Sequence, residues 1–219
     1  MIGVGMKTVL FDLDGTLLDT LADLTAAVNF ALGEVSLPLR TPEQVKAYVG
    51  NGIRNALTLA IGEGAEEKIE DALEYFHRYY RQHSLDYTCP YDGILPLLSR
   101  LQEEGFQIGI ISNKGDENVK ILAKRFFPQV SLALGEVPDR KRKPAPDSVW
   151  SAMKTLGAST EECVYIGDSD VDVFTAKNAG IPCIAVTWGF RSVAQLKEAG
   201  ATVFAATVEE LYQRICEVL

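Results

Sequence analysis

Two aspartates stand one residue apart where a short apolar segment ends, at Asp12 and Asp14. The segment 9–11, Val-Leu-Phe, is typical of a buried strand, and Gly15 marks where it stops. Because side chains alternate faces along a strand, we expect both carboxylates to project to the same side. Carboxylates that close repel each other unless one is protonated or a cation lies between them. An ordinary turn would explain one of these residues, so the pair predicts chemistry with a proton or a metal ion.

A second polar group lies at the end of the strand-like segment 107–112, where Ser112 is the last residue and Asn113 follows it. A hydroxyl and an amide at a strand end can bind an anion together with exposed backbone N–H groups, although Ser-Asn is also common loop chemistry. Lys143 stands directly before Pro144, which stiffens the chain. A lysine held in this way can act as a point charge on a phosphate group.

A third group, Gly167-Asp168-Ser169-Asp170-Val171-Asp172, begins where the strand-like segment 164–168 ends. Helix capping accounts for one or two polar residues there, but it requires neither Asp168 nor Asp172. Carboxylate oxygens from Asp12 and Asp168 suit Mg²⁺, which keeps several waters and takes one or two carboxylates plus a substrate phosphate. The cofactor predicted from these residues is therefore Mg²⁺.

The elements that must position these residues alternate between strands and helices. The predicted strands are 8–12, 107–112, 164–168 and 182–187, with a weaker candidate at 130–134. The predicted helices are 94–104, 116–126, 147–156, 171–179, 192–199 and 208–219. This alternation predicts the α/β class, with a Rossmann-like parallel sheet and helices on both faces. Ligands bind beyond the carboxyl ends of the strands in such sheets, which is where the polar groups lie.

The alternation is interrupted between residues 17 and 87, where no segment resembles a strand. Helical patterns occupy 20–32, 53–61 and 66–83, and Thr41-Pro42-Glu43-Gln44 combines an N-cap, a proline at the first helical position and a glutamine three residues on. We therefore expect a catalytic core of residues 1–16 and 88–219 with an inserted all-helical cap domain, residues 17–87. A cap over the site is favoured because binding sites prefer domain interfaces, and a bundle that merely decorates the sheet is the alternative.

Composition excludes several classes of partner. The 219 residues include 21 Lys and Arg against 30 Asp and Glu, and the net charge of −9 argues against nucleic acid or an anionic membrane as the main partner. None of the four cysteines forms a Cys-x-x-Cys pair, so zinc is not expected. No signal peptide or long apolar stretch is apparent, which predicts a soluble, cytoplasmic protein; translation could start at Met1 or Met6.

Together these residues resemble the haloacid dehalogenase-like phosphatase superfamily. Its four motifs match, in order, Asp12-x-Asp14-Gly15-Thr16, Ser112, Lys143-Pro144 and Gly167-Asp168-x-x-x-Asp172. The resemblance spans the chain, including the helical insertion after the first motif. It implies that Asp12 is the nucleophile and forms an aspartyl-phosphate. It also implies that Asp14 is the general acid/base and that its backbone carbonyl binds Mg²⁺.

The resemblance assigns the other motif residues to the metal and the phosphate. It implies that Asp168 is a direct metal ligand, whereas Asp172 orients a metal-bound water or Lys143. Ser112 would bind the phosphate, and Lys143 would neutralise charge on the nucleophile and the phosphoryl group. Such stabilisation is needed because phosphate monoesters are among the slowest substrates to hydrolyse without a catalyst.

A charge count predicts one more feature of the site. The four aspartates of the motifs carry −4, and Mg²⁺ and Lys143 together carry +3, which leaves −1 to meet a phosphate dianion. We therefore expect Asp14 to be protonated in the productive complex, where it supplies the proton of the leaving group. We also expect a further cation from the helical insertion.

Within the superfamily the chain looks most like the phosphoglycolate phosphatases. The residues that carry this resemblance are 19–24 with Asn29, 49–54, and 187–190. Arg54 is the candidate for the further cation, because a guanidinium forks onto a carboxylate; a surface ion pair is the alternative. Asn51 and Gly52 are candidates for substrate binding, although Asn-Gly is equally suited to a plain turn. The predicted substrate is a small phosphorylated metabolite, 2-phosphoglycolate.

Other activities fit the same motifs. A β-phosphoglucomutase-like isomerase would share the fold, the nucleophile and the metal, but its fourth motif often lacks the Gly-Asp-Ser-x-x-Asp form present here. A pyrophosphatase would also fit. A noncatalytic Mg²⁺-dependent module that holds a phosphorylated aspartate is a different class, in which Asp14 would have little purpose.

Overall fold

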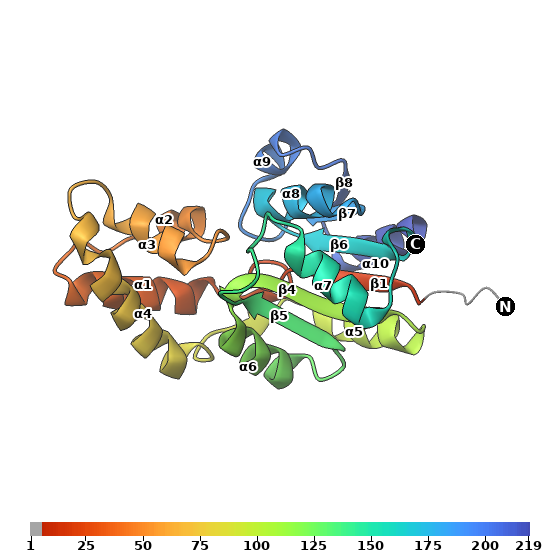
Figure 1. Ribbon diagram of the computed structural model, residues 1–219, viewed down its shortest axis with the longest axis horizontal. Helices are drawn as coiled ribbons and strands as arrows, with labels where there is room; N and C mark the ends of the chain where they lie inside the picture. The colour runs from red at the N-terminus through yellow and green to blue at the C-terminus, as the bar shows by residue number, and fades with distance from the viewer. Residues whose placement is uncertain (1–5) are drawn as a thin grey trace. The chain divides into compact units, whose positions relative to one another are not determined.

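The computed structural model describes residues 6–219 and divides them into two compact units (Figure 1). One unit combines the described residues up to Leu17 with Pro90–Leu219, and the other is Leu18–Cys89. The choice of start codon concerns residues 1–5, which lie outside the described residues. None of the helices in residues 6–219 has the length and apolar character that a membrane crossing requires.

The larger unit is built on a six-stranded sheet in the order β5-β4-β1-β6-β7-β8. All of its strand pairs are parallel, which confirms the predicted sheet. The chain adds β4 and β5 on one side of β1 and then β6, β7 and β8 on the other side. The strands are β1 Thr8–Phe11, β4 Gln107–Gly115, β5 Leu132–Glu136, β6 Cys163–Gly167, β7 Cys183–Val186 and β8 Val203–Ala205.

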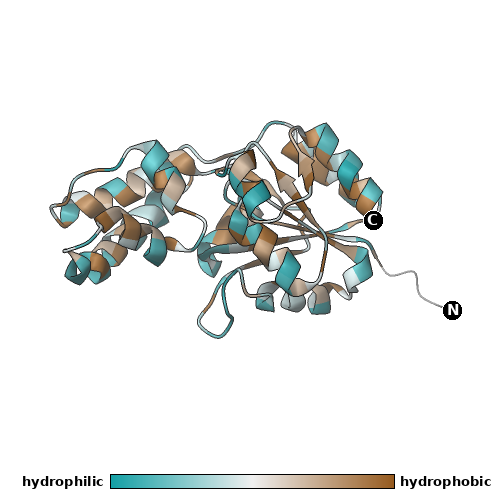
Figure 2. Ribbon diagram, turned by 90° about the horizontal axis from the view of Figure 1, so that it is seen from above, coloured by the Kyte–Doolittle hydropathy of each residue, from teal (hydrophilic) through white to brown (hydrophobic). Residues whose placement is uncertain are grey.

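Helices cover this sheet in two groups. Helix α7 packs on β1, β4 and β5 and contacts α8, whereas α5 packs on β4 and contacts α10. The side chain of Leu10 is fully buried in a cluster with Val149 of α7 and Ala176 of α8. Figure 2 shows the strands as hydrophobic and the helices as mixed. The helices are α5 Ile94–Glu103, α6 Asp116–Phe126, α7 Asp147–Leu156, α8 Asp170–Ala179, α9 Val193–Glu198 and α10 Val208–Val218.

The structure differs from the sequence-based prediction in its shortest strands. Strand β8 was not predicted, because three residues are too few to show a period. The two-residue strands β2 Leu18–Asp19 and β3 Cys89–Pro90, which pair with each other, were missed for the same reason. Strand β4 continues to Gly115, beyond the predicted end at residue 112, with an irregular register against β5 between Ile111 and Gly115.

The smaller unit is predominantly helical. Its helices are α1 Leu21–Glu34, α2 Pro42–Tyr48, α3 Ile53–Ile61, the short 3₁₀ segment Glu66–Lys68 and α4 Ile69–His83. Helix α2 begins with the predicted capping box, in which Thr41 and Gln44 bond to each other's backbone N–H groups. Helices α1 and α4 form its most extensive packing.

A buried carboxylate ties the two ends of the smaller unit together. Asp23 in α1 is 1% exposed. It accepts hydrogen bonds from the backbone N–H of Tyr87 at 3.1 Å and of Thr88 at 2.9 Å, and from the Thr88 hydroxyl at 2.7 Å. The side chain therefore joins the first helix of this unit to the segment that leaves it.

We predict that Asp23→Ala lowers the free energy of unfolding of the smaller unit by about 2–4 kcal/mol, because it leaves buried donors without an acceptor. Urea unfolding measures this loss, and hydrogen exchange at the Tyr87 and Thr88 amides should speed up with it. Asp71→Ala, on the exposed surface of α4, is the control and should change stability by less than about 0.5 kcal/mol. Equal effects of the two variants would contradict the assigned role of Asp23.

Candidate active site

The three central strands are paired in matching register at one edge of the sheet. Phe11 is paired with Ile110 of β4 and with Ile166 of β6. Asp12, Ser112 and Asp168 therefore emerge within two residues of these pairs, at one edge of the sheet. Strand β1 is also where the strand order reverses direction, and such switch points form the ligand crevice of open α/β sheets.

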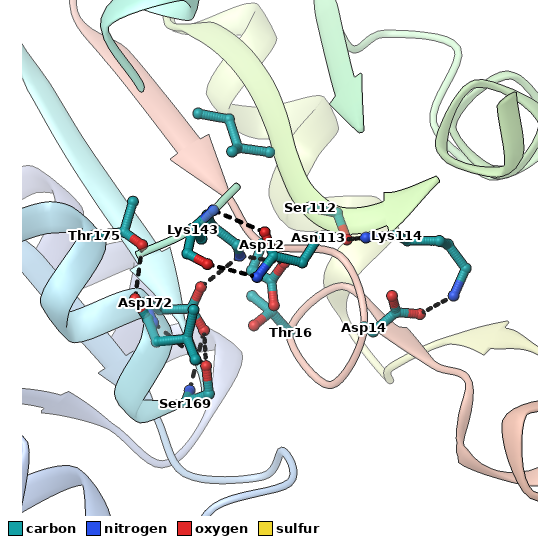
Figure 3. Close-up of polar contacts among 12 residues, drawn as sticks. Asp12, Asp14, Thr16, Ser112, Asn113, Lys114, Lys143, Ser169, Asp172 and Thr175 are labelled. Atoms are coloured by element: carbon teal, nitrogen blue, oxygen red, sulfur yellow. Dashed lines mark hydrogen bonds and ion pairs between the residues drawn. The ribbon is translucent and has the colours of Figure 1, made fainter. Parts of the chain in front are cut away.

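Lys143 lies at the centre of this edge and is 2% exposed (Figure 3). Its Nζ lies 2.8 Å from Asp12 Oδ1, 2.7 Å from Asp172 Oδ1 and 3.0 Å from the Tyr165 hydroxyl. Three partners match the three protons of an ammonium group. Tyr165 was not among the predicted site residues. The sequence signal that could have indicated it is a hydroxyl-bearing ring two residues before Gly167 in a strand otherwise apolar.

Asn113 holds the backbone of Lys143 rather than pointing freely into the site. Its Oδ1 accepts from the Lys143 N–H at 2.8 Å, and its Nδ2 donates to the Lys143 carbonyl at 3.0 Å. Ser112 is buried, and its hydroxyl accepts from the Lys114 N–H at 3.2 Å. Two consecutive residues at the end of β4 thus serve different parts of the site.

Three aspartates gather at this edge, and two of them contact Lys143. Asp12, Asp168 and Asp172 are buried, and one carboxylate oxygen of each lies within 4.8 Å of the others. Asp172 uses both of its oxygens: Oδ1 accepts from Lys143 and Tyr165, and Oδ2 accepts from the N–H and hydroxyl of Ser169. Because both of its oxygens are already bonded, Asp172 is better suited to orient other groups of the site than to bind a metal ion directly.

Asp168 is held by one hydrogen bond to each oxygen. Thr16 donates its hydroxyl to Oδ1 at 2.8 Å, and the Phe190 N–H donates to Oδ2 at 2.7 Å. Each oxygen retains a second lone pair, so Asp168 can still bind a cation. Together with Asp12 it offers the hard oxygen atoms that a divalent ion such as Mg²⁺ takes.

Two glycines allow the backbone to approach Asp168. Gly15 has a φ of +86°, and a Cβ added there would lie 2.5 Å from Asp168 Oδ2. A Cβ at Gly189 would overlap the same side chain. Next to it, the Trp188 indole N–H donates to the Thr16 carbonyl at 3.1 Å. Segment 187–190, noted in the sequence only as a resemblance, therefore packs against the aspartate of the fourth motif.

Burial and neighbouring charges shift the pKa values of the groups in this cluster. Burial raises the pKa of Asp12 well above its ordinary value, and Asp172 raises it further against the effect of Lys143. Burial and Asp172 also raise the pKa of Asp168, to about 7. Burial opposes the charge on Lys143, but Asp12 and Asp172 outweigh it, and the pKa of Lys143 rises well above its ordinary value.

Asp14 pairs with a different lysine. Its Oδ1 lies 2.7 Å from the Nζ of Lys114, at the end of β4, and the two side chains are 17% and 7% exposed. Strand β1 ends at Phe11, one residue before the predicted end, and the chain turns at once, with the Leu17 N–H bonded to the Leu13 carbonyl at 3.0 Å. Strand alternation therefore does not apply to Asp12 and Asp14, and the two carboxylates pair with different lysines. Lys114 was missed. The charge count had indicated a further cation, but that cation was expected in the helical insertion and not in β4.

The candidates in the helical insertion lie together around the start of α3. Gly52 is the N-cap of that helix, with a φ of 77°, and Asn51 precedes it. Both terminal nitrogens of Arg54 bond to Glu70, at 2.5 and 3.0 Å, and the two side chains are 56% and 73% exposed. Arg54 thus forms the surface ion pair that was its alternative interpretation.

Comparisons with known proteins agree with this geometry. Residues 9–186 match the family model described as haloacid dehalogenase-like hydrolase. A phosphoglycolate phosphatase from Pseudomonas savastanoi pv. phaseolicola is 35% identical over 84% of this chain and 70% of its own length. One from Aquifex aeolicus is 31% identical over 84% of this chain and 86% of its own length. A protein from Lactobacillus delbrueckii subsp. bulgaricus, whose crystal structure is known, is 38% identical in sequence to this chain. The match covers 97% of this chain and 99% of that one, and the two structures superpose with a TM-score of 0.92.

We predict that Asp12→Asn raises the Tm of the metal-free protein at pH 8 by about 2–4 °C, which corresponds to roughly 1 kcal/mol for a chain of this size. A carboxyl whose pKa is raised by folding stabilises the fold at low pH and costs stability once it ionises. The gain should therefore shrink as the pH falls toward 5. Thermal unfolding with a chelator measures it. The exposed Asp139→Asn removes the same charge and should show no such gain, and a lower Tm for Asp12→Asn at pH 8 would contradict the prediction.

Proposed function

Because the chain belongs to the haloacid dehalogenase-like hydrolases, we propose that it is a Mg²⁺-dependent phosphatase that hydrolyses a small phosphate monoester through a phosphorylated Asp12. The observation that carries the proposal is the buried Lys143, bound to both Asp12 and Asp172 beside a further carboxylate, Asp168. A phosphoryl group at Asp12 would lie next to an ammonium group and to oxygen ligands for a divalent ion. Those are the charges that phosphoryl transfer needs.

The first step transfers the phosphoryl group to Asp12. A carboxylate oxygen of Asp12 attacks phosphorus, and the bond between phosphorus and the ester oxygen breaks. The electron pair goes to the ester oxygen, which takes a proton from Asp14 and leaves as an alcohol. Lys143 stabilises the negative charge, and the Ser112 hydroxyl donates to a phosphoryl oxygen. Bound Mg²⁺ would add positive charge at the phosphoryl oxygens.

The second step releases phosphate. Water attacks the phosphorus of the aspartyl-phosphate while Asp14 takes its proton. The bond between phosphorus and the Asp12 oxygen breaks, which regenerates the Asp12 carboxylate and returns Asp14 to its acid form. Splitting the reaction in this way replaces one difficult displacement by two easier ones.

The structure changes the charge count behind this mechanism. Lys114 adds one positive charge beside Asp14, so the four aspartates, two lysines and Mg²⁺ sum to zero without protonation. The proton on Asp14 is therefore needed for the leaving group rather than to cancel repulsion. We propose 2-phosphoglycolate as the substrate, because relatives 31–35% identical bear the name phosphoglycolate phosphatase.

We predict Mg²⁺-dependent phosphate release with the highest kcat/KM on 2-phosphoglycolate in a panel with β-glucose 1-phosphate, pyrophosphate and p-nitrophenyl phosphate. Asp12→Asn should lower kcat by about 10³-fold or more, because it removes the nucleophile. Asp139→Asn is the charge-matched control and should keep full activity.

The same panel separates the alternatives. Weak activity on every ester would leave a phosphatase without phosphoglycolate specificity, and a preference for pyrophosphate would indicate a pyrophosphatase. Isomerisation of the glucose phosphate would indicate a mutase. A phosphorylated Asp12 that persists without turnover would indicate a binding module and contradict the hydrolase.

We also predict that the affinity for Mg²⁺ is about 10-fold lower at pH 6 than at pH 8. The pKa of Asp168 is raised to about 7, and a ligand must lose its proton before it binds a cation. Calorimetry of Mg²⁺ binding at the two pH values measures the effect, with Asp168→Asn as the variant that lacks the titrating ligand. Equal affinities at pH 6 and pH 8 would show that Asp168 does not control binding.

A further inference from the structure

Lys114 is a charged residue at this edge of the sheet to which the family motifs give no role. Its side chain is 7% exposed, and its Nζ pairs with Asp14 at 2.7 Å. Figure 3 shows this pair beside the cluster of Asp12, Lys143 and Asp172, on the far side of Ser112 and Asn113. A largely buried ion pair is weak evidence for stability, since apolar side chains of similar size would serve as well. Its position therefore calls for a role in binding or catalysis.

The backbone fixes Lys114 relative to the phosphate site. Its N–H donates to the Ser112 hydroxyl at 3.2 Å. The register between β4 and β5 is irregular between Ile111 and Gly115, which is the stretch that contains both residues. A phosphoryl group bound at Ser112 and Asp12 would thus have Lys143 on one side and Lys114 on the other.

The position of Asp14 indicates what Lys114 would meet. Asp14 must come within hydrogen-bond distance, about 2.8 Å, of the ester oxygen to which it gives its proton. Lys114 Nζ lies only 2.7 Å from Asp14, so it lies beside the first atoms of the leaving group. In the phosphate ester of a 2-hydroxy acid, a single carbon separates the ester oxygen from the carboxylate carbon. That carboxylate would fall within reach of the ammonium group.

We propose that Lys114 binds the carboxylate of the leaving group and thereby selects phosphate esters of 2-hydroxy acids over esters of neutral alcohols. The inference rests on the proposed function and adds the residue that determines its substrate class. Without substrate, Lys114 pairs with the Asp14 carboxylate, so a substrate carboxylate would compete with Asp14 for the same ammonium group. When the substrate carboxylate takes up Lys114, the Asp14 side chain turns from the lysine to the ester oxygen.

Lys114 suits this role better than Arg54, which the sequence alone had suggested. Arg54 already pairs with Glu70 in a solvent-exposed contact, and water competes with a substrate carboxylate at such a site. Lys114 is largely shielded from water, so its attraction for a second anion is stronger. The two assignments differ in which variant removes the substrate preference.

The test compares 2-phosphoglycolate with ethyl phosphate, which lacks the carboxylate and is otherwise similar. The measured quantity is the ratio of kcat/KM on the first substrate to kcat/KM on the second. We expect Lys114→Met to lower this ratio by about 10- to 100-fold, the range for losing a charge-assisted hydrogen bond. Lys114→Arg should restore most of the ratio because it keeps the positive charge.

Lys120→Met is the matched control. Lys120 also pairs with an aspartate, Asp116, at 2.6 Å, but it is 63% exposed on α6, and its loss should leave the ratio unchanged. Thermal unfolding checks that each variant is folded. Lys114→Gln, which keeps a polar side chain beside Asp14, provides a second neutral variant with the same expected loss.

Each other outcome has a definite meaning. An equal loss on both substrates in the Lys114 variants would show that the lysine only positions Asp14, which overturns the proposal. A ratio that collapses in Arg54→Met and persists in Lys114→Met would assign the carboxylate to Arg54 instead. If the wild-type protein hydrolyses both esters without preference, the proposed selection for 2-hydroxy acid esters is contradicted and the proposed phosphatase activity stands. If it hydrolyses neither, the proposed function fails as well.

Discussion

The site depends on one buried ammonium group. Lys143 Nζ contacts Asp12, Asp172 and Tyr165 within 3.0 Å, although its side chain is only 3% exposed. Burying an isolated charge in that position would be costly, and the two carboxylates and the hydroxyl offset that cost. In return the lysine ties together the end of β1, strand β6, helix α8 and the connection between β5 and α7.

The parallel sheet makes this meeting possible. Strands β4 and β6 flank β1 in matching register. Segments as far apart in the sequence as Phe11 and Ile166 therefore meet at one edge of the sheet. Burial and crowding of the carboxylates there raise the pKa values of Asp12 and Asp168. Ionising buried carboxylates costs stability, and a bound cation would offset that cost.

Each of the two aspartates of the first motif pairs with a different lysine. Lys143 contacts Asp12, where the phosphoryl group would be transferred, and Lys114 contacts Asp14, where the leaving group would take its proton. This separation follows from the end of β1 at Phe11, because the turn that begins there directs the two carboxylates to different partners. The two aspartates therefore differ in environment although only Leu13 lies between them, and such a difference is what the proposed acid and nucleophile roles require.

The sequence alone determined the alternation of strands and helices, the parallel sheet and the motifs Asp12-x-Asp14, Ser112, Lys143 and Asp168, because apolar periodicity and strand-end polar residues are local signals. It did not reveal β8, which is too short to show a period, or Lys114 and Tyr165, whose residue types have many ordinary uses in a strand. It also extended the first strand to Asp12, whereas β1 ends at Phe11, because alternation of apolar residues does not mark where a strand ends. Only the tertiary structure decided which cation each carboxylate meets. Those partners come from segments up to 131 residues apart, and no local pattern encodes a contact between distant strand ends.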